Sequence, residues 1–150
     1  MAAEILRPAG AGDREAIESL VRAAYGGYVE RIGRRPAPMD ADYAALIAAG
    51  HVTVLERDGA VAGAIVLVPM EGHLLVENVA VDPAAQRGGL GRRLMAHAEE
   101  EARALGLAEL RLYTNEKMVE NIAWYPRLGY RETERRAESG FARVFFAKRI

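Results

Sequence analysis

A glycine-rich turn constrains this chain more than any other feature. The apolar segment Leu74–Val81 ends at Asp82-Pro83, and the stretch Gln86-Arg87-Gly88-Gly89-Leu90-Gly91 leads into an amphipathic segment that ends at Leu105. This pattern predicts a strand, a tight turn and a helix. The first N–H groups of a helix have no intrahelical partner and the helix dipole adds positive potential, so a helix start attracts anions. We therefore predict an anion-binding turn.

The composition of the turn favours a diphosphate as the anion. Its glycines let an anion approach the backbone without a Cβ in the way, and Arg87, Arg92 and Arg93 add positive charge. No Walker A sequence occurs, and Leu94 stands where a dinucleotide-binding fingerprint needs its third glycine. The alternative to an anion-binding turn is a turn with a purely structural role, which only orients the helix.

The rest of the chain predicts one α/β (α+β) domain over residues 1–150. Alternating and helical apolar patterns, with Asp58-Gly59 as a hairpin turn, give a mixed sheet of about seven strands covered by about four helices. The predicted strands are 4–7, 52–57, 61–68, 74–81, 109–114, 130–136 and 141–148, and the predicted helices are 13–28, 40–50, 91–105 and 118–128.

Composition excludes several classes of function. The chain has no cysteine, so disulfides, thiolate metal sites and thiol catalysis are excluded. A net charge of −1 argues against nucleic acid or an anionic membrane as a partner. The three histidines are scattered without metal-ligand spacing, so we expect no metal. With no signal-peptide pattern and no apolar run of membrane length, we expect a cytoplasmic protein.

Two motifs resemble those of the GNAT superfamily of N-acetyltransferases. The stretch Asn78–Met95 matches the acetyl-CoA signature, Arg/Gln-x-x-Gly-x-Gly/Ala, which follows a Val-Asp-Pro-like strand end. The stretch Asn121–Tyr130 looks like the Asn/Ala-x-x-x-Tyr-x-x-x-Gly-Phe/Tyr element. The resemblance implies a GNAT-like sheet that is splayed between its fourth and fifth strands, with acetyl-CoA as cosubstrate in the gap.

The resemblance also implies which residues bind acetyl-CoA. Backbone groups of Val79 and Val81 would pair with the pantetheine arm, and the amides from Arg87 to Arg92 would hold the pyrophosphate. Asn115 and Asn121 are rivals for a side-chain amide contact, since neither has the usual spacing from Tyr125. The implied set is Val79, Ala80, Val81, Gln86, Arg87, Gly88, Gly89, Leu90, Gly91, Arg92, Asn115 and Asn121.

Acyl transfer to an amine requires removal of a proton from the ammonium group and benefits from protonation of the leaving thiolate. Glu77, on the fourth strand, is the candidate base, directly or through water; its alternative role is an exposed polar residue or ion pair. Tyr125 is the candidate acid by motif position; its alternative role is core packing with Leu128. Pro126 is expected to kink the helix at Tyr125.

The acceptor is the least determined part of this prediction. We expect the first two helices, their loop and the closing hairpin to form its site, for a small-molecule or peptide amine. Tyr25 and Tyr43 could line that site, although their helical spacing fits the core as well. Two alternatives are a silent CoA-binding sensor or structural subunit of the same fold, and a nucleotide-binding module of unrelated chemistry. An exposed final strand would support a homodimer by edge pairing.

Overall fold

A computed structural model describes residues 4–150, except the side chains of Gln86 and Arg87. The chain divides into two compact units. The first unit holds residues up to Leu67 together with Asn78–His97, and the second holds Val68–Glu77 together with Ala98–Ile150. Each unit is described by itself. No helix in the described residues is long and apolar enough to cross a membrane.

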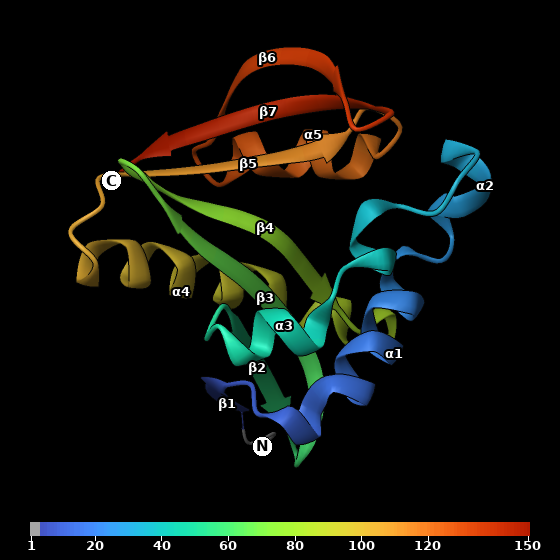
Figure 1. The fold of residues 1–150 in the computed structure, drawn as a ribbon, viewed down its shortest axis with the longest axis vertical. Helices are drawn as coiled ribbons and strands as arrows, with labels where there is room; N and C mark the ends of the chain where they lie inside the picture. The colour runs from blue at the N-terminus through green and yellow to red at the C-terminus, as the bar shows by residue number, and fades with distance from the viewer. Residues whose placement is uncertain (1–3) are drawn as a thin grey trace. The chain divides into compact units, whose positions relative to one another are not determined.

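In the described part of the chain, seven strands form one mixed sheet in the order β1-β2-β3-β4-β5-β7-β6, which confirms the predicted fold class (Figure 1). The strands are β1 (Glu4–Pro8), β2 (Val52–Arg57), β3 (Ala60–Met70), β4 (His73–Val81), β5 (Glu109–Asn115), β6 (Arg131–Glu138) and β7 (Phe141–Arg149). The α-helices are α1 (Arg14–Tyr25), α2 (Tyr28–Ile32), α3 (Tyr43–Ala48), α4 (Leu90–Ala104) and α5 (Val119–Arg127). Short 3-10 helices are η1 (Ala11–Asp13), η2 (Ala37–Asp40) and η3 (Pro83–Gly88).

Within residues 4–150, five α-helices form in place of the four expected, because the first predicted helix is interrupted. Helix α1 ends at Tyr25, and Gly26-Gly27 separate it from the short helix α2. Gly33, with φ of 87°, then ends α2 in the left-handed conformation that favours glycine.

The predicted helical stripe of α1 is confirmed in the core of the first unit. Ile17, Leu20 and Val21 are buried at the spacing of one helix face. Strand β3 is buried along its middle, as expected for a strand that is apolar on both faces.

A buried polar network connects three segments of the first unit at the residue Asn78. The Tyr25 hydroxyl, at the end of α1, lies 2.7 Å from Asn78 Oδ1 and 2.7 Å from the Val79 carbonyl oxygen. Asn78 Nδ2 donates to the Tyr43 hydroxyl of α3 at 2.9 Å, and that hydroxyl donates to the Pro38 carbonyl at 2.6 Å. The sequence pattern predicts these tyrosines in the core or in an acceptor pocket. Both are buried in the core, and both hydroxyls also form a hydrogen bond with Asn78.

The final strand of the chain, β7, is not an edge strand. Strand β7 pairs with both β5 and β6, both antiparallel, so β6 is the edge (Figure 1). Every residue of β6 before Glu138 is exposed, and most are charged. The expectation of an exposed final strand is therefore wrong, and edge charges of this kind oppose strand pairing between molecules. The homodimer itself stays a prediction.

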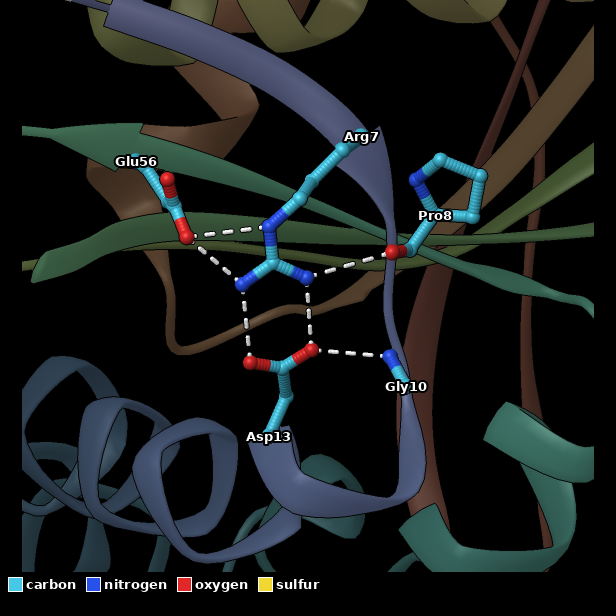
Figure 2. Close-up of polar contacts among 5 residues, drawn as sticks. All are labelled: Arg7, Pro8, Gly10, Asp13 and Glu56. Carbon is cyan, nitrogen blue, oxygen red and sulfur yellow. Dashed lines mark hydrogen bonds and ion pairs between the residues drawn. The ribbon is translucent and has the colours of Figure 1, made fainter. Parts of the chain in front are cut away.

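An ion-pair cluster joins η1, which directly precedes α1, to strands β1 and β2 of the first unit (Figure 2). The Arg7 guanidinium donates to both Asp13 carboxylate oxygens, at 2.7 and 2.9 Å, and to Glu56 Oε1 of β2. Asp13 also accepts from the Gly10 backbone N–H at 2.8 Å. These contacts, above all that of Arg7, lower the pKa of Asp13 to about 2.

The pKa of Asp13 makes this cluster pH-dependent. A carboxyl whose pKa falls on folding stabilises the fold above its unfolded pKa, and that stabilisation is lost as the pH falls through the folded value. We expect Asp13→Asn to lower the free energy of unfolding by about 1–2 kcal/mol at pH 7, allowing for solvent screening, with the difference shrinking between about pH 4 and pH 2.

Urea unfolding of both proteins across this pH range checks the prediction. Asp40→Asn is the matched control, because the Asp40–Arg35 pair is 62% and 55% exposed and contributes little. An Asp13→Asn effect no larger than that of the control at pH 7 would contradict the role given to the cluster.

Candidate donor site and catalytic residues

The turn from β4 into α4 is built by local sequence chemistry. The Asp82 side chain caps η3 by accepting from the Ala84 N–H at 2.9 Å, and Pro83 occupies the first position of η3. Gly89 then adopts φ of 74°, and its carbonyl accepts from Arg93 N–H in the first turn of α4. Leu90 is fully buried and anchors the start of the helix. The predicted strand–turn–helix unit is thus confirmed.

A cation that the sequence did not indicate packs against this turn. A Cβ added at Gly88 would lie 2.5 Å from Nη2 of Arg57, at the end of β2, so any side chain there would displace the guanidinium from the turn. Glu4 holds Arg57 at 2.8 Å and Arg93 at 2.7 Å, and these two hydrogen bonds lower its pKa. One carboxylate therefore orients two guanidinium groups beside the turn and leaves a net positive charge there.

This arrangement fits the diphosphate of acetyl-CoA. The turn offers the α4 N-terminus, exposed Gly88 and Gly89, and the paired Arg57 and Arg93. Arg92 is exposed on the first turn of α4. Gln86 and Arg87 belong to η3, and their side chains lie outside the described part of the chain, so their predicted roles rest on their backbone amides.

The backbone of β4 is oriented as the pantetheine prediction requires. Asp82 N–H donates to the Ala62 carbonyl of β3 at 2.8 Å. Because the polar groups of successive strand residues alternate between edges, those of Ala80 also face β3, and those of Val79 and Val81 face the other edge. In the described residues, β4 pairs with β5 only over Leu74–Val76. Val79 and Val81 therefore have no strand partner on that edge.

The Val79 carbonyl has a partner of another kind, the Tyr25 hydroxyl at 2.7 Å. A carbonyl oxygen accepts two hydrogen bonds, and the Tyr25 proton has a second acceptor in Asn78 Oδ1. The Val79 N–H and one lone pair of its carbonyl thus stay available to a ligand.

Glu77, the candidate base, is the last β4 residue of the second unit and is partly exposed. Its charge acts on Tyr113 of β5: burial raises the pKa of the Tyr113 hydroxyl, and the Glu77 carboxylate raises it further. Glu77 forms no ion pair with the described side chains, and its role as the base stays a prediction.

Tyr125, the candidate acid, lies in a buried aromatic cluster and is 5% exposed. Its ring centroid is 5.6 Å from that of Phe146 and 6.0 Å from that of Tyr130. Helix α5 runs through Pro126 to Arg127, close to its predicted end, and the kink expected at Tyr125 stays a prediction. Core packing of the Tyr125 ring is therefore present, and a catalytic use of its hydroxyl stays a prediction.

The two rival asparagines differ in how they are engaged. Asn115 Oδ1 accepts from Lys117 N–H at 2.9 Å and closes the turn after β5. Asn121 donates weakly to Thr114 Oγ1 at 3.4 Å, and its Oδ1 accepts no hydrogen bond from the described part of the chain. Asn121 therefore has the freer amide oxygen of the two. Among the described residues, no group of three His, Cys, Asp or Glu side chains is arranged to hold a metal ion.

Comparison with known proteins identifies the family of this chain. A family model described as the acetyltransferase (GNAT) family matches residues 15–130. The IAA acetyltransferase of Azospirillum brasilense is 39% identical over 79 residues, which are 51% of this chain and 52% of that protein. The ribosomal protein bS18-alanine N-acetyltransferase of Escherichia coli K12 is 44% identical over 55 residues, 37% of each protein. The matches thus span about half or less of these relatives.

A solved structure shows the same fold. The PaiA N-acetyltransferase of Thermoplasma acidophilum, in complex with coenzyme A, superposes with a TM-score of 0.83 over 99% of both chains at 14% identity. The motifs, the sheet order and the family model agree, and the chain belongs to the acetyltransferase (GNAT) family.

Proposed function

We propose that this protein transfers an acetyl group from acetyl-CoA to a primary amine of a small molecule or peptide. The observation that carries the proposal is the unpaired edge of β4 at Val79 and Val81, leading directly into the capped, arginine-flanked turn at the start of α4. This continuous surface offers backbone groups for a pantetheine arm and amides with positive charge for a diphosphate. We also propose a cytoplasmic location.

The proposed chemistry is direct attack of the amine on the thioester. Glu77, alone or through a water molecule, takes a proton from the substrate ammonium group, whose unperturbed pKa is near 10.4. The free amine forms a C–N bond with the acetyl carbon, and its nitrogen then loses a second proton to solvent. The C–S bond breaks as the tetrahedral intermediate collapses to the neutral amide, and Glu77 releases its proton to solvent. Tyr125 donates its hydroxyl proton to the departing thiolate and regains a proton from solvent.

Release of the CoA thiol measures this activity. We expect acetyl-CoA with amines from a panel of polyamines, amino acids, aminoglycosides and N-terminal peptides to release thiol above the hydrolysis rate, for at least one class. In parallel, calorimetric titrations with acetyl-CoA, NAD and ATP measure which of these ligands the protein binds. Tight acetyl-CoA binding without turnover of any amine would favour a silent CoA-binding subunit, and preference for a nucleotide would reject the proposal.

The role of Tyr125 is tested by Tyr125→Phe, which keeps the ring in its aromatic cluster. Loss of the proton donor should lower kcat by about 10²-fold. Tyr130→Phe is the matched control, because the buried Tyr130 hydroxyl has no partner in the described residues and its removal should leave kcat unchanged. Turnover by Tyr125→Phe at the wild-type rate across the pH range would remove Tyr125 from the mechanism.

A further inference from the structure

Arg143 is a buried arginine that the donor site does not use. It lies on β7, opposite Asn115 of β5 and Arg136 of β6, and is 8% exposed. Burial of a guanidinium group costs free energy unless its charge and N–H groups are compensated. The groups around Arg143 therefore show what it is arranged to do.

Two aromatic rings hold the Arg143 guanidinium in place. Its central carbon lies 4.2 Å from the ring centroid of Tyr113 and 5.5 Å from that of Phe141. Such cation–π contacts restrict the plane of the group without using its N–H donors. The guanidinium is thus preorganised, with its hydrogen-bonding edge left for other partners.

Only part of that edge is occupied. Arg143 Nη1 donates to Glu138 Oε1 at 2.6 Å, while Oε2 of the same carboxylate pairs with Arg136 at 2.9 Å. Glu138 therefore serves two guanidinium groups. Arg143 has no other acceptor among the described residues, and none of its nitrogens is a fully buried unpartnered atom. The remaining N–H groups of Arg143 therefore keep access to solvent.

The candidate base lies near the same ring. Glu77 and Tyr113 directly follow Val76 and Leu112, the last residues paired between β4 and β5 in the described part of the chain. Burial raises the pKa of the Tyr113 hydroxyl, the charge of Arg143 lowers it, and the charge of Glu77 raises it. A carboxylate for an ammonium group and a guanidinium for an anion thus flank one side chain of β5. A structural role for Arg143, as a cross-strand partner of Glu138, is the competing explanation.

We propose that Arg143 binds a carboxylate of the acceptor, so that the acceptor class is amines that carry a carboxylate, as amino acids do. The proposal rests on the proposed function, in which the amine of the acceptor is acetylated. It adds the protein group that selects the acceptor by a second functional group, the carboxylate. A planar guanidinium matches the two oxygens of a carboxylate, and Arg143 has the free donors to form such a pair. Arg143 is thereby a specificity-determining residue.

Calorimetric binding to the CoA-loaded protein tests the proposal without requiring turnover. The probes are L-amino acids paired with their carboxamides, at about pH 6.5, where both α-amino groups are largely protonated. For at least one pair, we expect the carboxylate member to bind about tenfold or more tightly, in keeping with a hydrogen bond to a charged group. Arg143→Met should abolish that preference and leave carboxamide binding within about twofold of wild type.

Arg136→Met is the matched control, because Arg136 shares Glu138 with Arg143 but is half exposed and rests on Phe145. It should keep the preference. Should Arg143→Met fail to fold, Glu138→Gln replaces it: a carboxylate-binding Arg143 freed of its partner should bind the acid members more tightly.

Equal binding of acid and carboxamide by the wild type, or equal weakening of both by Arg143→Met, would overturn the proposal and leave Arg143 a structural residue. Absence of tightening in Glu138→Gln would overturn it too. Thiol release with the same probes separates this from the proposed function: a carboxylate preference without any acetyl transfer would reject the transferase and retain the site.

Discussion

The first unit depends on the hydrogen bonds that the buried Asn78 side chain forms with Tyr25 and Tyr43. Through it, the end of α1 and the start of α3 are bound to the strand that is proposed to hold acetyl-CoA. Every polar atom removed from such a buried network leaves a partner unsatisfied, at a cost of about 1–3 kcal/mol each. The same contact brings the Tyr25 hydroxyl to the Val79 carbonyl. The helices expected to bind the acceptor and the strand expected to bind the donor are therefore held by one hydrogen-bonded side chain.

The turn after β4 depends on a second, electrostatic contact. Glu4 joins Arg57 and Arg93, residues from β2 and α4, and Gly88 leaves room for the Arg57 guanidinium. The glycine therefore has two uses: it lets an anion approach the backbone, and it lets a cation lie against the turn. Arginine is used differently in the second unit. There Arg143 is buried between aromatic rings, with one shared carboxylate.

Features set by neighbouring residues were predictable from the sequence. The seven strands, the Asp82-Pro83 turn and helix α4 follow from apolar periodicity, caps and glycines within short windows, and the structure confirms them. The motifs predicted the family for the same reason. Contacts between distant residues were not predictable. Nothing local indicates that Arg57 meets Gly88, that Tyr25 meets Asn78, or that Arg143 is buried. The position of β7 between β5 and β6 in the sheet is likewise set by the pairing of β5 with β7.

The central claim is that β4 and the following turn form one binding surface for acetyl-CoA. A crystal structure of the protein with CoA tests it most directly. We expect the pantetheine amides to bond to the backbone of Val79 and Val81, and the diphosphate to accept from the amides between Gly88 and Arg92. A diphosphate bound elsewhere, or a pantetheine arm with no contact to Val79 or Val81, would contradict the claim.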